Sequence, residues 1–343
     1  MPMNTSLLMR AVVASCLSAG LVLPADFPEA RISNGQITAS LFLPDASRGY
    51  YRSTRFDWSG AVNSLTYGGH NFYGVWYDRI DPTVINWKYE NGEIVAGPCS
   101  ALYGPVDEFA VPLGYDEAKP GGTFIKLGVG VLRKTSGEYN RYFPYQVLNP
   151  GKWTVETKRD SVSFAQDLSD PESGYSYVYR KVVRLTPGKP EMTIEHTLKN
   201  TGKQAIQSQV YNHNFVVLDK QAPGPDFAVR VPFEISVARP TNKALIDVKG
   251  RDVVYAKPLT GEDQAVVAIQ GFGNSAKDAE VVIENKKAGA GVRITGDRPL
   301  VRSLLWSIRT VLAIEPYVAI DVQPGAEFSW KNVFDYYTVK PKP

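Results

Sequence analysis

Hydrophobic and polar residues alternate with a period of two along most of the chain, from about residue 31 to the C-terminus. The segment 192–198 shows the pattern most clearly, and its positions that share one face are Met192, Ile194, His196 and Leu198. An Asn-Thr-Gly turn sequence separates it from a second alternating segment at 205–218. A period of two is typical of strands that bury one face, and the 3.6-residue period of amphipathic helices is nearly absent. The pattern therefore predicts an all-β protein.

Turn residues recur between the predicted strands, for example at Pro44-Asp45 and Pro324-Gly325. The strands that they separate are spaced by roughly ten to fifteen residues, which favours two large antiparallel sheets packed face to face. No Pro-, Ser- or Gly-rich tract and no block of charge divides residues 26–343, so we expect one domain over this range. The alternation does not distinguish a supersandwich from a jelly roll or from two tandem sandwiches.

The composition suits a protein with many strands and tight turns. The 343 residues include 19 Tyr, 14 Phe, 6 Trp, 29 Gly and 24 Pro. Aromatic residues fit pleated surfaces, and Gly and Pro set the dihedral angles of turns. The formal net charge of +3 is distributed without a basic run. Because phosphate backbones are bound by clustered Lys and Arg, this distribution argues against a nucleic-acid partner.

The first 25 residues differ from the rest of the chain. Arg10 precedes an uncharged segment at 11–23, which is followed by a Pro-Ala pair. A positive charge, a short apolar stretch and a small residue at a cleavage point are typical of an export signal. We therefore expect a signal peptide at 1–25 and a periplasmic or secreted mature protein. The sequence before Cys16 loosely resembles a lipoprotein cleavage site, so export as a lipoprotein is the alternative. An apolar stretch of 13 residues is shorter than the about 20 needed to span a bilayer, so we expect no integral membrane segment after signal removal.

Cys99 is the only cysteine outside the predicted signal. A single thiol forms no internal disulfide, so we expect stability to come from the hydrophobic core. Zinc or iron–sulfur sites with several cysteines are excluded for the same reason. Asp219 and Asp226 could bind calcium, although nothing in their spacing demands it. The chain has no phosphate-cradling loop, dinucleotide fingerprint or His-Glu-x-x-His motif, and we expect neither a metal nor a cofactor.

Three short motifs occur along the chain in a fixed order. They are Ile-Ser-Asn-Gly-Gln-Ile at 32–37, Leu-Lys-Asn-Thr-Gly at 198–202 followed by Tyr-Asn-His-Asn-Phe at 211–215, and Ala-Ile-Glu-Pro-Tyr at 313–317 followed by Val-Gln-Pro-Gly at 322–325. Together they resemble the opening strand, the Asn-His strand and the C-terminal glutamate segment of the galactose mutarotase (aldose 1-epimerase) superfamily. The resemblance implies a large antiparallel β-sandwich, the galactose mutarotase-like supersandwich, and a sugar or oligosaccharide as the partner.

The resemblance also implies a reaction, in which an aldose 1-epimerase-like isomerase interconverts sugar anomers with Glu315 as base and His213 as acid. This chemistry needs one acid and one base within hydrogen-bond reach of two neighbouring oxygens, and it needs no cofactor. His213 is one of only three histidines and lies among polar residues that are costly to bury without a purpose. The alternative for His213 is a hydrogen-bonded structural histidine.

Glu315 interrupts an apolar stretch at 310–316, where a carboxylate is either paired, at a strand end, or raised in pKa for catalysis. Pro316 removes a ladder donor, so we expect the strand to end or bulge there and to direct Glu315 into a cleft. The alternative is a structural salt bridge from Glu315 to Arg309 or Arg302.

Seven further residues are candidates for binding the sugar, because polar groups take sugar hydroxyls and aromatic rings cover the C–H surface. They are Arg55, Asp57, His70, Asp107, Glu108, Lys126 and Asn212. Asn212 belongs to the polar run beside His213, and His70 lies in a predicted loop or hairpin. Arg55 and Asp57 place a cation, an anion and the Trp58 ring close together, with a surface salt bridge as the alternative.

Asp107 and Glu108 are adjacent, so on a strand their side chains point to opposite faces. One of them could face the pocket and take the place of the family's second active-site histidine, which this chain lacks. Lys126 interrupts an apolar stretch and could either reach an acidic sugar or protect an edge strand from aggregation.

The chain departs from the family at one position. The family's second active-site histidine, in a His-Gly-Gly stretch, has no counterpart in the comparable region at 103–109. Two alternatives therefore stay open. One is a glycoside hydrolase or polysaccharide lyase on the same fold, for which a third carboxylate about 5 to 10 Å from Glu315 would be the sign. The other is a non-catalytic carbohydrate-binding protein. The sugar and the oligomeric state are not specified by the sequence.

Overall fold

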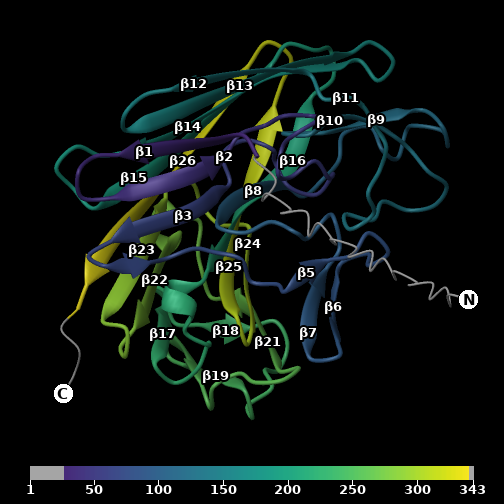
Figure 1. Ribbon diagram of the computed structural model, residues 1–343. Helices are drawn as coiled ribbons and strands as arrows, with labels where there is room; N and C mark the ends of the chain where they lie inside the picture. The colour runs from purple at the N-terminus through teal and green to yellow at the C-terminus, as the bar shows by residue number, and fades with distance from the viewer. Residues whose placement is uncertain (1–26, 340–343) are drawn as a thin grey trace, which may run out of the picture.

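The computed structural model describes residues 27–339 of the protein (Figure 1). The predicted signal peptide at 1–25 lies outside the described residues. Within 27–339 the chain forms 26 β-strands and two short 3-10 helices, η1 (Leu218–Lys220) and η2 (Ala276–Asp278). No helix in this range is long and apolar enough to cross a membrane. The all-β prediction is confirmed.

The larger of the two main sheets has ten strands, and every neighbouring pair in it is antiparallel. In spatial order the strands are β12 (Lys152–Thr157), β13 (Ser161–Asp170), β14 (Tyr175–Leu185), β15 (Glu191–Asn200), β26 (Glu327–Thr338), β23 (Ala290–Gly296), β22 (Glu280–Asn285), β17 (Phe227–Arg230), β20 (Asp252–Tyr255) and β19 (Ile246–Lys249). The alternation expected for 192–198 is confirmed in β15, where Met192, Ile194 and Leu198 are fully buried.

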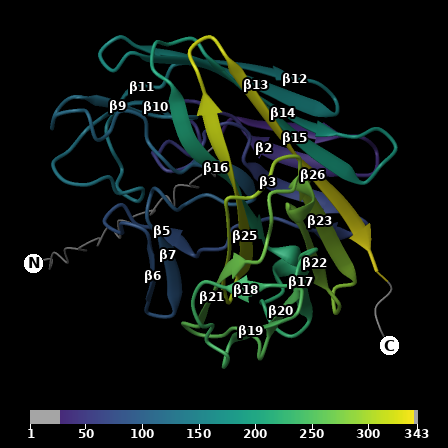
Figure 2. The same ribbon diagram turned by 180° about the vertical axis from the view of Figure 1, so that it is seen from behind.

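The second main sheet has six antiparallel strands. In spatial order they are β18 (Ser236–Val237), β21 (Gln264–Gln270), β24 (Arg302–Ile308), β25 (Val311–Val322), β16 (Ile206–Val216) and β8 (Pro105–Phe109). The long strands β16 and β25 run side by side and come from distant parts of the sequence (Figure 2).

Three smaller sheets complete the structure. One contains β1 (Glu29–Ser33), β2 (Thr38–Phe42), β3 (Val62–Tyr67) and β4 (His70–Asn71). The second contains β11 (Val147–Asn149), β10 (Gly130–Arg133) and β9 (Thr123–Lys126), and the third contains β5 (Arg79–Ile80), β7 (Glu93–Ala96) and β6 (Trp87–Glu90).

The two main sheets share one hydrophobic core, which decides where the polar residues of β25 can point. Leu312 and Ile314 of β25 belong to the same buried cluster as Ile194 of β15 and Phe334 of β26. Because side chains alternate across a strand, Glu315 projects from the other face of the six-stranded sheet. That face is covered by a second buried cluster, rich in aromatic residues from the segments that precede β8 and follow β10.

Candidate functional site

The central strands of the six-stranded sheet place His213 directly opposite Glu315. Asn214 pairs with Ile314 and Tyr211 pairs with Tyr317 in the same register, which places His213 opposite Glu315. The ladder has no pair at this position or at the adjacent one, where Asn212 lies opposite Pro316, which has no N–H to donate. The expected strand end or bulge is wrong, because β25 continues through Pro316 without a shift of register.

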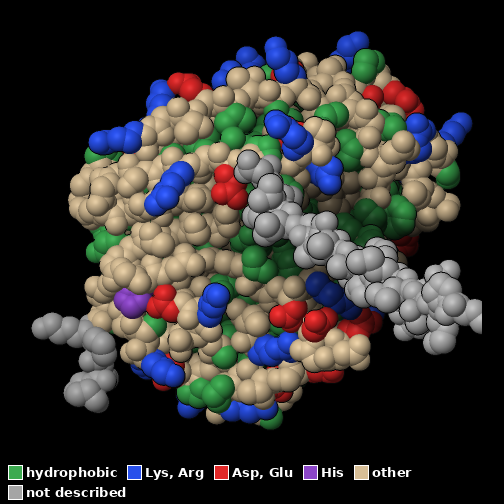
Figure 3. All heavy atoms as spheres, viewed as in Figure 1, with side chains coloured by type: hydrophobic (Ala, Val, Ile, Leu, Met, Phe, Trp, Pro, Cys, Tyr) green, Lys and Arg blue, Asp and Glu red, His purple; other side chains and the backbone are tan. Residues whose placement is uncertain are grey.

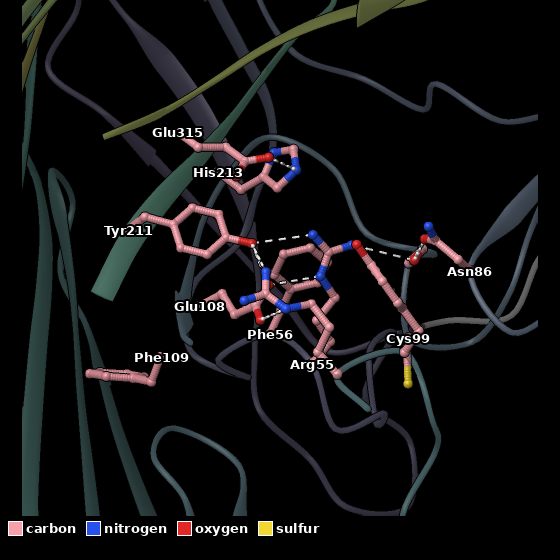
Figure 4. A network of polar contacts seen from close by, with 12 residues as sticks. Arg55, Phe56, Asn86, Cys99, Glu108, Phe109, Tyr211, His213 and Glu315 are labelled. Carbon is pink, nitrogen blue, oxygen red and sulfur yellow. Dashed lines mark hydrogen bonds and ion pairs between the residues drawn. The ribbon is translucent and has the colours of Figure 1, made fainter. Parts of the chain in front are cut away.

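His213 and Glu315 are in direct contact (Figure 4). His213 Nε2 lies 3.2 Å from Glu315 Oε1, and the side chains are only 4% and 7% exposed. The second carboxyl oxygen of Glu315 accepts a hydrogen bond of 2.8 Å from the Tyr317 hydroxyl. The His213 ring stacks on Phe215 with 3.7 Å between ring centroids. Among the described residues, the buried Nδ1 atom of His213 has no hydrogen-bond partner.

Burial favours the neutral form of both groups, because it penalises charge. It raises the pKa of Glu315, and the positive charge of Arg55 opposes this only in part. It lowers the pKa of His213 well below its ordinary value, and Arg55 acts in the same direction. The pair therefore favours a protonated carboxyl group beside a neutral imidazole, with one transferable proton between them.

Glu108 on β8 is the centre of a buried charged cluster on the same face of the sheet. Its Oε2 atom accepts hydrogen bonds from Arg55 Nε, at 2.8 Å, and from the Tyr211 hydroxyl (Figure 4). Arg141 Nε and Lys126 Nζ lie 3.4 and 3.6 Å from its Oε1 atom. Burial alone would raise the pKa of Glu108, but Arg141, Arg55 and Lys126 outweigh it and hold the pKa at about 2. Glu108 is thus an ionised anchor for cations rather than a proton donor.

The loop between β2 and β3 brings Arg55 to this cluster, and Tyr51 holds the loop in place. The Tyr51 hydroxyl accepts hydrogen bonds from the backbone N–H groups of Arg55 and Phe56, at 3.2 and 3.1 Å, and donates one to the carbonyl of Cys99. The Arg55 guanidinium lies 4.3 Å from the centroid of the Phe56 ring, which packs edge-on against His213. These contacts fix Arg55 between the Glu108 cluster and the His213–Glu315 pair.

A cleft with a volume of about 170 Å³ opens beside the pair. Its aromatic lining consists of Trp76, Trp87, Tyr142, Phe215 and Trp306, and its polar lining of Arg55, Asn86, Ser100, His213, Gln264 and Glu315. Pockets for drug-sized ligands measure about 300–1,000 Å³, so this smaller cleft suits a ligand such as a single sugar ring. Aromatic faces and hydrogen-bonding groups together are what such a ring requires.

No protein-family model and no curated protein sequence matches this chain. Its structure resembles that of a protein from Synechocystis sp. PCC 6803, with a TM-score of 0.54, 13% identity and coverage of 96% of this chain and 100% of the other. An aldose epimerase homologue from C. elegans matches with a TM-score of 0.52, 15% identity and coverage of 92% and 100%. A galactose mutarotase-like protein from Clostridium acetobutylicum matches with a TM-score of 0.51 and 12% identity, over 90% of this chain and 95% of the other.

The chain has the galactose mutarotase-like fold. The predicted fold class is therefore confirmed.

Within the mutarotase-like fold, two of the predicted sugar-binding residues lie next to the His213–Glu315 pair. Arg55 lines the cleft. Glu108 forms an ion pair with Arg55 but does not line the cleft itself. Lys126 is fully buried beyond Glu108 and does not line the cleft either. Burial lowers its pKa to about 8, against the opposing effect of Glu108.

Asp57, Asp107 and Asn212 belong to a different buried cluster and do not line the cleft. Asp107 Oδ2 lies 2.7 Å from Lys181 Nζ and 2.9 Å from His196 Nε2, both on the ten-stranded sheet. Asn212 Nδ2 donates to Asp107 Oδ1 at 3.0 Å, and Asp57 lies 3.4 Å from Lys181. Asp107 and Asn212 thus take part in contacts between the main sheets, and Asp57 joins a loop to the ten-stranded sheet, instead of lining the cleft.

His70 lies on β4, away from the cleft. Its Nδ1 atom is 2.6 Å from Asp219 Oδ2, and the other oxygen of Asp219 accepts the backbone N–H of Asn71. Within residues 27–339, no group of three or more His, Cys, Asp and Glu side chains is arranged to hold a metal ion.

Several residues of the site were missed from the sequence. Tyr211 and Tyr317 are two positions from His213 and Glu315, so counting along the strand alternation would have found them. Arg141 comes from the loop at 134–146, which carries no periodic pattern, and nothing in the sequence places it beside Glu108.

Proposed function

We propose that the protein interconverts the anomers of a free sugar by acid–base catalysis. The observation that carries the proposal is the contact of 3.2 Å between His213 Nε2 and Glu315 Oε1 at the wall of an aromatic-lined cleft. The mutarotase-like fold supports a carbohydrate ligand, and structural neighbours with this fold include an aldose epimerase homologue.

The reaction moves two protons and opens one ring bond. Glu315 as the carboxylate removes the proton of the anomeric hydroxyl, and the C1–oxygen bond of the ring breaks as a carbonyl group forms at C1. His213 as the imidazolium protonates the departing ring oxygen. Rotation about the C1–C2 bond and the reverse proton transfers close the ring with the opposite configuration. No electron donor or acceptor is needed, and both groups return to their starting forms.

Burial decides which protonation state of the pair is the resting one. Ring opening converts the carboxylate and imidazolium into a carboxyl group and a neutral imidazole. Burial favours that neutral state, because it raises the pKa of Glu315 and lowers the pKa of His213. The free site therefore rests in this neutral form, and the cycle starts from the ionised form, in which the same proton has moved from Glu315 to His213.

A hydrolase is less well supported by the position of Glu108. A glycosidase needs two carboxyl groups on either side of the bond that it cleaves. Glu108 is fully buried, does not line the cleft, and has its oxygens surrounded by Arg55, Arg141 and Lys126. It is therefore poorly placed to reach an anomeric carbon.

To test the proposal, the protein comprising residues 26–343 is incubated with a panel of freshly dissolved aldoses and uronic acids. Polarimetry and NMR exchange between the anomeric protons then measure the rate at which the anomers interconvert. At least one sugar should equilibrate faster than in buffer, and the Glu315→Gln variant should abolish the acceleration. Parallel assays for new reducing ends and unsaturated products test the hydrolase and lyase alternatives. Binding without any acceleration by the wild-type protein would instead identify a non-catalytic sugar-binding protein.

A further inference from the structure

The cations around Glu108 outnumber the carboxylates that neutralise them. Arg55 and Arg141 carry permanent charges, and within residues 27–339 each forms an ion pair with Glu108 alone. Lys126 adds an amine 3.6 Å from the same carboxylate. One negative charge therefore faces two guanidinium groups and a lysine, which leaves an excess of at least one positive charge.

Neighbouring acids do not remove this excess. Burial raises the pKa of Glu315, which favours its uncharged form. Asp107 points to the other face of the sheet, where it pairs with Lys181. Over the molecular face shown in Figure 3, Lys and Arg side chains are dispersed in contact with solvent, whereas the cations at Glu108 are gathered inside the protein. A buried charge without a partner is costly, so the excess indicates a negatively charged ligand.

The two guanidinium groups keep hydrogen-bonding capacity for such a ligand. Each arginine has five N–H donors. Arg55 Nη1 reaches only Ser100 Oγ among the described residues, at a long 3.4 Å, and the Arg141 side chain is 25% exposed. Arg55 lines the cleft; Arg141 does not line it, but its neighbour in the chain, Tyr142, does. Planar guanidinium groups bind the paired oxygens of a carboxylate or a phosphate better than other side chains do.

We propose that the sugar bound in this cleft carries an anionic group, either a carboxylate or a phosphate ester, and that Arg55 and Arg141 bind that group. The inference rests on the proposed function, since it places a sugar beside His213 and Glu315. A neutral sugar would leave the excess positive charge uncompensated, so the cleft should discriminate against it.

Calorimetric titration tests the charge preference directly, with glucuronate, glucose 6-phosphate and glucose, and with the three corresponding galacto sugars. A hydrogen-bonded charged partner should make at least one anionic sugar bind about ten- to a hundredfold more tightly than its neutral counterpart. The preference should shrink in 0.5 M NaCl, which screens the interaction. Tighter binding of the uronates identifies a carboxylate, and tighter binding of the 6-phosphates a phosphate ester. Equal affinities within each series, or no binding of any anionic sugar, would overturn the inference.

Arg141→Gln should remove most of the anionic preference, and Arg141→Lys should keep part of it because the charge remains. Arg52→Gln is the matched control, because Arg52 is an exposed arginine of the same loop as Arg55 and lies outside this cleft. It should leave the preference unchanged. Melting temperatures of the variants show whether each is folded. An unchanged preference in folded Arg141→Gln would exclude Arg141 from the site.

NMR exchange between anomers, run on the same samples, separates this inference from the proposed function. Accelerated exchange without a charge preference refutes only the anionic substrate. A charge preference without accelerated exchange refutes only the isomerase.

Discussion

Asp107 and Glu108 are consecutive residues of β8, yet their carboxylates lie on opposite faces of the sheet, Asp107 at 2.7 Å from Lys181 and Glu108 at 2.8 Å from Arg55. Strand alternation separates them. Asp107 ties the six-stranded sheet to β14 of the ten-stranded sheet, and Glu108 anchors an arginine of the cleft. Substitutions at the two neighbours should therefore change different properties of the protein.

Asp107→Asn should lower the free energy of unfolding by about 3–5 kcal/mol, because it leaves Lys181 buried without its nearest carboxylate. Urea unfolding followed by circular dichroism measures the change. Asp167→Asn is the control, since Asp167 is an exposed residue of β13 and its substitution should have almost no effect. If the two variants unfold at the same urea concentration, the buried ion pair does not have the stabilising role assigned to it.

Glu315→Gln and His213→Asn should each reduce the rate of anomer exchange by at least about a hundredfold, since a positioned acid or base contributes a factor of about 10² to 10⁴. Because the two groups act as one unit, the double variant should be little slower than the poorer single variant. Steady-state rates on the sugar that the wild type converts provide the measurement. Independent, multiplicative effects in the double variant would contradict a shared proton-transfer step.

His213 should also make the stability of the protein depend on pH. Burial holds the pKa of His213 below its unfolded value of about 6.5, so the folded state resists protonation of the imidazole. The corresponding stability is present above pH 6.5 and is lost as the pH falls toward the folded pKa. His213→Asn removes this contribution, so the stability difference between wild type and variant should narrow between pH 7.5 and pH 5. Urea unfolding at several pH values would show it, and a constant difference would refute the assignment.

Export remains a proposal that rests on the sequence of residues 1–25. Arg10 and the uncharged segment after it should direct removal of this region, so the mature protein should begin near Asp26. Mass spectrometry of the protein from its native host gives the N-terminus. Recovery of chains that retain residues 1–25 would rule out cleavage.

Strand periodicity accounts for most of what could be predicted from the sequence. It identified β15 and β16, and it separated Asp107 from Glu108 correctly. The pairing of His213 with Glu315 was not predictable from alternation, because it depends on the register between strands about a hundred residues apart. The resemblance to the mutarotase superfamily supplied that link.

The placement of His70 and Arg141 was beyond the reach of the sequence pattern. His70 was expected near the site but pairs with Asp219, because the short β3–β4 hairpin carries it away from the cleft. Arg141 was not identified, although it lies 3.4 Å from Glu108. In both cases the position depends on the path of a hairpin or a loop, which local residue order does not specify.

Asn214 compensates for the missing donor of Pro316 in a way that affects how the site can move. Its side-chain Nδ2 donates to the carbonyl oxygens of Asn212 and Ile314, at 3.0 and 3.1 Å. His213 and Glu315 therefore stand on a rung where a side-chain amide replaces a main-chain crosslink. We therefore expect local opening of the sheet to cost least at this rung, so that His213 and Glu315 can move apart around a bound ring while the strands on either side stay paired.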